Sequence, residues 1–195
     1  VETVSMAIKQ LGKKAEIRLS LRSKRDSVEE ATSLSWAASA LRHLEEVKIW
    51  SEARIIASHF PFGSEVDVFT LSETALLRGT LIVYPRIANR KLTFHRWDEG
   101  DPKEIALGGV QQPTGDAHEI LVEQIDLFLT PLLACGDGGK RLGYGGGFYD
   151  RTFAEATGYK IGVGYQFQRS DGWDSESHDV SLDAFLSEAR LELFH

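Results

Sequence analysis

Three short apolar runs constrain the fold of this chain more than any other feature. They occupy residues 54–60, 80–85 and 125–130, and each has the length of a buried strand rather than of a membrane helix. Between the first two runs, Thr70 and Glu73 have the spacing of a capping box, and Gly79 is suited to end the short helix that they start. The order strand, helix, strand predicts a right-handed crossover within a parallel sheet.

Two further helices are predicted before these strands. The first covers about residues 4–23, and the second begins after a capping box formed by Ser27 and Glu30. Their apolar positions at helical spacing are Ile8, Leu11, Ala15 and Leu19 in the first helix, and Ala31, Leu34, Ala38, Leu41 and Leu44 in the second.

The remaining segments complete an α/β pattern. Residues 91–97 alternate like an exposed strand, residues 98–118 are rich in Gly, Pro and Asp and are expected to be loop, and 159–165 form another strand. A helix ending near Gly158 precedes that strand, whereas the tail over 182–194 fits either a strand or a helix. The pattern predicts a three-layer α/β/α sandwich with a mostly parallel sheet, in a single domain over residues 1–195.

Charge and composition exclude several classes of partner. The net charge of −7 argues against a nucleic-acid-binding surface, and no apolar run approaches the length of a membrane span. One cysteine, Cys135, allows no internal disulfide and points to a reducing compartment. The sequence shows no basic leader followed by an apolar block, so nothing in it suggests secretion. We expect a cytoplasmic protein, a monomer or a weak homodimer, that binds neither nucleic acid nor membrane.

A glycine-rich turn follows the strand at 125–130. Glycines 143, 145, 146 and 147 let backbone N–H groups face inward where the chain enters a helix near Gly147, which favours a bound anion. Lys140 and Arg141 add positive charge, and an arginine can bind two phosphate oxygens at once. The spacing matches neither a Walker A loop nor the dinucleotide fingerprint. The turn is interpreted as a phosphate site, and the alternative is a flexible glycine-rich connection.

Several charged side chains are placed to serve such a site. Asp150 can hold Mg²⁺ beside the phosphates, or it can be a first-turn aspartate favoured by the helix dipole. Lys14, Arg18 and Arg22 fall on one helix face, where they either reach a triphosphate or form a solvated basic surface.

Loops at the same sheet edge supply further candidates. Glu65 follows the strand at 54–60 and can bind the N–H groups of a heterocycle, or it is a solvent-facing acid. Gln168 and the pair His178-Asp179 follow the strand at 159–165. The histidines show no metal-ligand spacing, and Cys135 is interpreted as a small buried side chain rather than a nucleophile.

These segments together resemble the 5-formyltetrahydrofolate cyclo-ligase family over nearly the whole chain. Lys14-x-x-x-Arg18 is similar to its amino-terminal basic pair, Gly63-Ser-Glu65-Val66 to its folate loop, and residues 97–113 to its connection ending in Gln-Pro. Arg141-Leu-Gly-Tyr-Gly-Gly-Gly-Phe-Tyr-Asp150 matches the most specific family motif.

The resemblance implies a Rossmann-like fold, ATP and Mg²⁺ as requirements, and 5-formyltetrahydrofolate as the small-molecule substrate. Arg141 and Lys14 would act in catalysis, Asp150 would hold the metal, and Glu65, Tyr149 and Gln168 would bind the substrate. The implied ATP-binding residues are Lys14, Arg18, Arg141, Gly143, Tyr144, Gly145, Gly146, Gly147, Phe148, Tyr149 and Asp150.

The chain departs from the family pattern at Val68, Leu132 and Cys135-Gly136. These departures favour an alternative function, a non-catalytic relative that binds a folate or a phosphorylated cofactor. A phosphotransferase acting on a sugar or hydroxyl acceptor is a second alternative. We further hypothesise that Asp137 replaces the family carboxylate absent at Gly136 and acts near Mg-ATP, and the alternative is that Asp137 only starts a tight turn.

Overall fold

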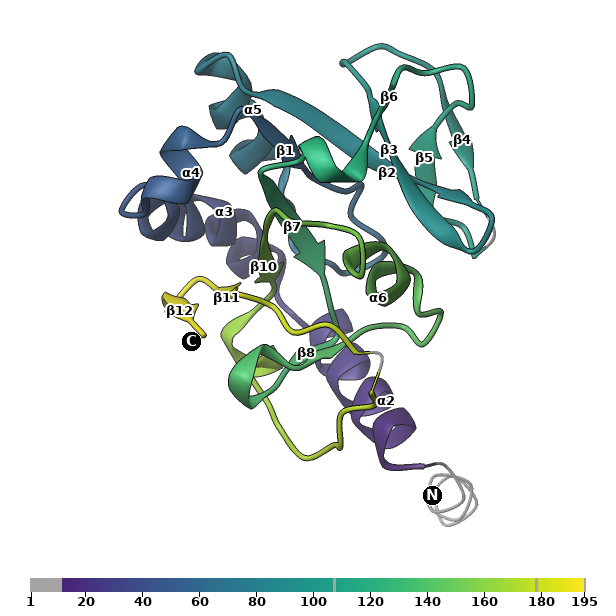
Figure 1. Cartoon of the computed structure of the whole chain (residues 1–195). Helices are drawn as coiled ribbons and strands as arrows, with labels where there is room; N and C mark the ends of the chain where they lie inside the picture. Colours follow the sequence, from purple (N-terminus) through teal and green to yellow (C-terminus); the bar gives the residue numbers. More distant parts are fainter. Residues whose placement is uncertain (1–11, 107, 178, 195) are drawn as a thin grey trace.

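The computed structural model describes residues 12–106, 108–177 and 179–194. An eight-stranded sheet runs through the centre of the molecule in the order β12-β11-β10-β7-β1-β2-β3-β6 (Figure 1). Its strands are β1 (Ile55–Ala57), β2 (Leu81–Ala88), β3 (Lys91–Arg96), β6 (Glu119–Ile120), β7 (Leu127–Pro131), β10 (Tyr159–Val163), β11 (Ala184–Leu186) and β12 (Leu191–Leu193). The five strands from β11 to β2 are parallel, and β12, β3 and β6 are antiparallel additions at the two edges.

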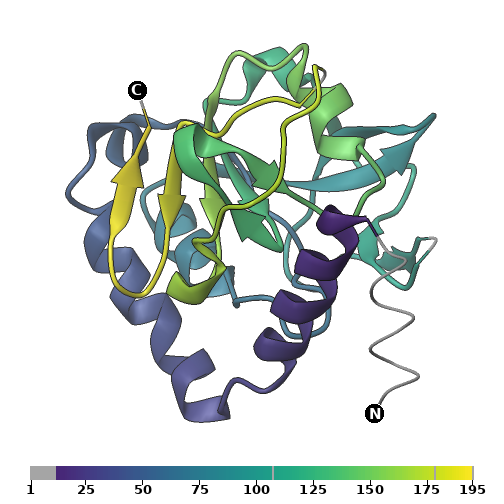
Figure 2. The same ribbon diagram turned by 90° about the horizontal axis from the view of Figure 1, so that it is seen from below.

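Helices cover both faces of the sheet. They are α2 (Lys13–Asp26), α3 (Glu30–Leu44), α4 (Lys48–Glu52), α5 (Phe69–Leu77) and α6 (Phe148–Phe153), with three short 3₁₀ turns at Val122–Gln124, Asp137–Gly139 and Gln166–Gln168. The blue α3 and the green α6 lie on opposite sides of the strands in Figure 2. This arrangement confirms the predicted α/β/α sandwich with a mostly parallel sheet.

Alternation along the strands divides the core between these two faces. In β7, Leu127 and Leu129 pack toward α3, α4 and α5, whereas Phe128 packs toward α6. In β1, Ile56 packs on the face of α3, α4 and α5, and Ala57 packs on the face of α6. Successive side chains of a strand point to opposite faces, so a run of apolar residues is what a sheet covered on both sides requires.

The connection from β1 to β2 joins two parallel strands through a helix, as predicted. Ile55 pairs with Leu81 in parallel register, and α5 lies between the two strands in sequence. Gly79 has φ of +84° and donates its N–H to the Leu76 carbonyl, while the Thr80 N–H reaches the Ala75 carbonyl. These paired bonds end α5 in a Schellman motif, as its glycine predicts.

Both predicted capping boxes were wrong. Ser27 is the residue after the last turn of α2, its hydroxyl donates back to the Lys24 carbonyl, and Glu29 occupies the N-cap of α3. Thr70 lies inside α5, and the Asp67 carboxylate accepts the Phe69 N–H at its start. The spacing of a capping box was present at both places, but the observed N-caps, Glu29 and Val68, each lie two residues from the predicted ones.

The predicted helix faces also need correction. Leu34 is 75% exposed, and Ala31 and Ala38 are exposed as well, because α3 turns Trp36 and Ala40 toward the sheet instead. Leu19 of α2 is exposed while Leu21 is buried. Helix α2 extends to Asp26, and the predicted residues 4–11, including Ile8 and Leu11, lie outside the described residues.

Three other segments differ from expectation. Residues 98–118 contain a hairpin of β4 (Lys103–Ile105) and β5 (Gln111–Pro113), which lies beside β2 (Figure 1). The strand at 91–97 is largely buried, since α6 packs against β3. The tail forms strands, and α6 ends at Phe153, before Gly158. In the described part of the chain, no helix combines the length and the apolar character that crossing a bilayer demands.

Candidate active site

A cavity of about 460 Å³ opens where β1 and β7 end. Its wall includes His59 and Phe60, which follow β1, and Pro131, the last residue of β7. Because parallel strands end at the same edge of a sheet, this is where ligands are expected in such folds. Helix α2, the segment 108–112 and residues 141–150 close the other sides.

The glycine turn is built on a short hairpin after β7. Strands β8 (Ala134–Cys135) and β9 (Arg141–Leu142) pair antiparallel, and the chain then turns through Gly143–Gly147 into α6. Gly145 has φ of +96° and Gly147, the N-cap of α6, has φ of +63°. These conformations favour glycine, so the residue type follows from the turn that the chain makes here.

Arg141 and Asp150 form an ion pair across this turn. Arg141 Nη2 lies 3.0 Å from Asp150 Oδ2, and both side chains are largely buried. The guanidinium also lies 5.1 Å from the centre of the Tyr149 ring. A Cβ at Gly143 would be 2.6 Å from Arg141 Nη1, so the glycine leaves room for the arginine. Arg141 Nε is buried without a hydrogen-bond partner among the described residues, which leaves a donor for a ligand.

Two cations of α2 border the same turn. Arg18 donates from Nε to the Gly143 carbonyl at 2.8 Å, and Lys14 Nζ lies 2.6 Å from Glu176 Oε1 and 3.6 Å from Asp179 Oδ2. The hydrogen bond that Lys14 donates to Glu176 raises the pKa of Lys14, which therefore remains charged. Arg22 is exposed and does not line the cavity. Lys140 Nζ lies 3.8 Å from Asp171 Oδ1. The structure thus brings Lys14 and Arg18 to the turn but not the other two cations.

Glu65 lies deep in the cavity wall. Its Oε2 accepts the Phe62 N–H at 2.9 Å, and its Oε1 accepts the Tyr144 hydroxyl at 2.6 Å. Two residues that sequence reasoning missed stand near it, because Arg25 Nη1 and His59 Nε2 each lie 3.9 Å from its carboxylate. Burial lowers the pKa of His59, and the Leu129 carbonyl is 3.2 Å from its Nδ1. A neutral imidazole therefore faces the carboxylate.

Tyr149 lines the cavity, and burial raises the pKa of its phenol, which stays neutral. Gln168 has a different setting. Its amide donates to the carbonyls of Leu132 and Leu133, its oxygen accepts the Tyr165 N–H, and it is not among the residues that line the cavity. Asp179 lines the cavity, whereas His178 lies outside the described residues.

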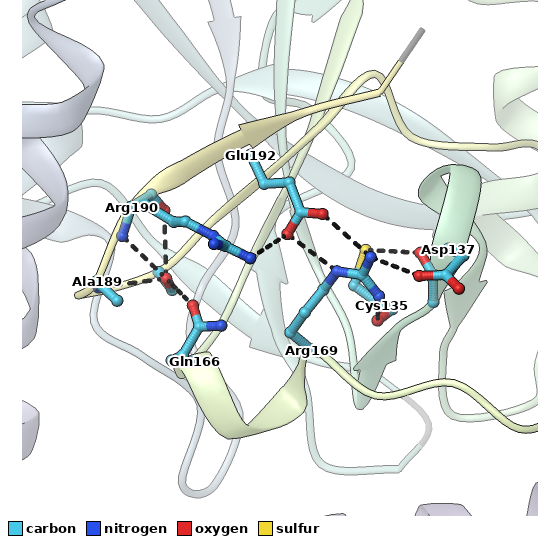
Figure 3. A network of polar contacts seen from close by, with 9 residues as sticks. Cys135, Asp137, Gln166, Arg169, Ala189, Arg190 and Glu192 are labelled. Carbon is cyan, nitrogen blue, oxygen red and sulfur yellow. Dashed lines mark hydrogen bonds and ion pairs between the residues drawn. The ribbon is translucent and has the colours of Figure 1, made fainter.

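Asp137 does not reach the cavity, which corrects the hypothesis that it acts near Mg-ATP. Its carboxylate is 75% exposed and accepts a 2.7 Å bond from Arg169 Nη2. Arg169 also donates to Glu192 of β12 and to the Cys135 carbonyl, so it ties the last strand to the β8 hairpin (Figure 3). The sequence interval to Arg141 suggested proximity, but the intervening 3₁₀ turn directs Asp137 away from the glycine turn.

Cys135 is fully buried, as predicted for a small core side chain. Burial raises the pKa of its thiol to about 12, so it carries no thiolate near neutral pH. Within the described segments, no group of three or more His, Cys, Asp or Glu side chains could hold a metal ion. A metal at this site would have to take most of its ligands from a bound phosphate and from water.

Comparison with known proteins identifies curated relatives of this chain. A 5-formyltetrahydrofolate cyclo-ligase from Mycolicibacterium smegmatis is 30% identical over 91% of this chain and 94% of its own length. The enzyme of the same name from Haemophilus influenzae is 27% identical over 87% of this chain and 95% of its own length.

Solved structures share the fold. The 5,10-methenyltetrahydrofolate synthetase of Aquifex aeolicus superposes with a TM-score of 0.80 at 22% identity, covering 93% of both chains. The 5,10-methenyltetrahydrofolate synthetase of Mycoplasma pneumoniae superposes with a TM-score of 0.74 at 23% identity, covering 91% of this chain and 99% of its own length. The family model for 5-formyltetrahydrofolate cyclo-ligases matches residues 10–188, and the chain therefore belongs to the 5-formyltetrahydrofolate cyclo-ligase family.

Proposed function

We propose that this chain converts 5-formyltetrahydrofolate to 5,10-methenyltetrahydrofolate, with ATP as the second substrate and ADP and phosphate as the other products. One observation carries the proposal. The glycine turn with its cations and the buried carboxylate of Glu65 line the same cavity of about 460 Å³, so a nucleotide phosphate and a heterocycle can meet there.

The chemistry requires two steps. The formyl oxygen attacks the γ-phosphorus of ATP and ADP leaves, which gives a phosphorylated formyl group on N5. N10 then attacks the activated carbon, the N10 proton is lost, and phosphate departs with the former formyl oxygen as the five-membered ring closes. Neither step requires a protein nucleophile.

The protein contributes position and charge. Arg141 and Lys14 neutralise charge on the transferring phosphoryl group, and Arg18 holds the Gly143 carbonyl so that the turn keeps its shape. The N–H groups of residues 143–147, with Tyr144, Phe148 and Tyr149 around them, form the remaining phosphate contacts. This assignment rests on the placement of all these residues around one cavity.

The substrate side is assigned to Glu65 and Tyr149. The Glu65 carboxylate accepts hydrogen bonds from the N–H groups of the pterin ring, and Tyr149 presents an aromatic wall to it. Gln168 contributes indirectly in this proposal, because its side chain fixes the Leu132 and Leu133 carbonyls just beyond β7.

Asp150 is the protein ligand proposed for Mg²⁺. Its Oδ2 is paired with Arg141, and a single carboxylate suits an ion that keeps several waters and binds phosphate oxygens. When bound, Mg²⁺ supplies positive charge to the phosphates of ATP. The proposal further places the protein in the cytoplasm, as a monomer or a weak homodimer without a nucleic-acid or membrane partner.

The non-catalytic alternative loses its main support in this setting. Val68, Leu132 and Cys135 are core residues, Gly136 packs near Trp173, and none of these four lines the cavity. The departures from the family pattern therefore lie in the packing around the site rather than in the described cavity wall.

A turnover assay tests the proposal. The protein, Mg-ATP and 5-formyltetrahydrofolate are mixed, and the absorbance of the methenyl product is followed together with ADP and phosphate. We expect all three products in equal amounts. Tight folate binding by titration calorimetry without turnover would favour the non-catalytic relative, and turnover with a sugar but not a folate would favour the other phosphotransferase.

A further inference from the structure

Tyr144 connects the two halves of the cavity. It belongs to the glycine turn, yet its hydroxyl donates to Glu65 Oε1 at 2.6 Å, on a loop 79 residues earlier in the chain. The same hydroxyl accepts a 2.7 Å bond from Arg25 Nη2 of α2. One side chain thereby joins the phosphate turn, the proposed folate loop and a helix.

The partners of this hydroxyl are buried charges. The side chains of Arg25 and Glu65 are 2% and 5% exposed, and their nearest charged atoms are 3.9 Å apart, beyond hydrogen-bond distance. The tyrosine hydroxyl therefore relays the hydrogen bonding between them. Burial and the adjacent Glu65 raise the pKa of Tyr144, so it remains a neutral donor to the carboxylate.

The backbone of Tyr144 lies between two glycines of the turn. Gly143 and Gly145 flank it, Gly145 has φ of +96°, and the Gly143 carbonyl is held by Arg18. The residue Tyr144 is 43% exposed, and its ring also meets the Phe62 ring edge-on at 6.3 Å between centroids. A nucleotide bound to residues 143–147 would restrain Tyr144 and, through its hydroxyl, the orientation of the Glu65 carboxylate.

We propose that Tyr144 is a positioning residue that couples ATP binding to folate binding through its hydroxyl bond to Glu65. The proposal rests on the proposed function and adds a thermodynamic link between its two subsites. Tyr144 bonds to Glu65 from the turn that would bind the nucleotide, so contacts between the nucleotide and this turn restrain the Glu65 carboxylate in one orientation. Folate then binds more tightly, and by reciprocity ATP binds more tightly to the folate complex.

The test compares the full chain with Tyr144→Phe, which removes only the hydroxyl. The dissociation constant of 5-formyltetrahydrofolate is measured by calorimetry without nucleotide and with saturating Mg²⁺ and a non-hydrolysable ATP analogue. The ratio of the two constants is the coupling factor. We expect a factor of roughly five to ten in the natural protein, the scale of one hydrogen bond, and a factor near one in Tyr144→Phe.

Tyr159→Phe is the matched control, because the Tyr159 hydroxyl bonds the Asp183 carbonyl at 3.3 Å and does not line the cavity. It should keep the natural coupling factor. A loss of stability alone would lower folate affinity equally with and without nucleotide and would leave the factor unchanged.

The outcomes separate this inference from the proposed function. A natural protein that turns over but has a coupling factor of one, or a Tyr144→Phe protein that keeps the natural factor, would overturn the coupling alone. A natural protein that binds neither folate nor nucleotide would overturn both.

Discussion

Arg141 and Asp150 lie at opposite ends of the glycine turn, nine residues apart, and their side chains meet at 3.0 Å. The turn is thus closed on itself by an ion pair, and its residues 143–147 line the cavity. The bond from Nη2 to Asp150 holds the Arg141 guanidinium in one orientation. Its Nε remains without a partner among the described residues. An arginine prepared in this way can meet a phosphoryl group without reorganising.

Arg141→Ala should therefore lower kcat/KM by roughly two to three orders of magnitude. This is the scale expected when a positive charge that stabilises the transferring phosphoryl group is removed. Steady-state kinetics with both substrates measure this, and thermal melting checks that the variant is folded. Near-normal turnover would show that Arg141 serves only to hold Asp150.

Gly145→Val should abolish nucleotide binding, because a β-branched residue at φ of +96° is strained and projects a side chain beside Arg18. Gly100→Val is the matched control, since Gly100 has φ of +97° in an exposed turn that does not line the cavity. Both variants carry similar backbone strain, and only the first should lose calorimetric ATP binding. Equal affinity in the two proteins would exclude the glycine turn as the phosphate site.

The two aspartates of the hairpin and turn should differ in their response to magnesium. Asp150→Asn should raise the Mg²⁺ concentration needed for the half-maximal rate, because Asp150 lines the cavity. Asp137→Asn should leave that concentration unchanged, because Asp137 faces Arg169 instead. Mg²⁺ titrations of the initial rate distinguish the two, and a shift caused by Asp137→Asn alone would reverse the assignment.

His59 should make the fold sensitive to mild acid. Burial lowers its pKa from the ordinary value of 6.5, so below that value the unfolded chain binds a proton that the folded chain does not. Stability should consequently fall as the pH drops from about 6.5 to the lowered pKa of the folded state. His59→Gln should lose this component of the pH dependence of Tm, whereas His118→Gln, at an exposed site, should keep it. An unchanged slope in His59→Gln would contradict the assignment.

The sheet was predictable because its strands are buried on both faces. Residues 81–84 and 127–129 are apolar without interruption. Gly79 marks the end of α5 because its positive φ favours glycine. The β4–β5 hairpin was missed because Lys103–Ile105 and Gln111–Pro113 carry no alternating apolar pattern. The helix faces were misjudged because tertiary packing selected Trp36 over Leu34.

The residues of the candidate site were also predictable only in part. The glycine turn and Glu65 could be found from residue type and from their place beyond strand ends, and Lys14 and Arg18 from their spacing on one helix face. Arg25 and His59 could not, because their role depends on burial beside Glu65, which no local pattern encodes. Asp137 and Asp150 look alike in sequence, and only the path of the chain between them separates a surface ion pair from a residue of the cavity wall.

Transfer of the formyl oxygen to phosphate is the central claim, and an isotope experiment tests it most directly. The protein is given Mg-ATP and 5-formyltetrahydrofolate that carries a heavy oxygen isotope in its formyl group, and the released phosphate is analysed by mass spectrometry. The account predicts one methenyl product for each ADP and one heavy oxygen in each phosphate. Unlabelled phosphate, or ADP formed without the methenyl product, would contradict it.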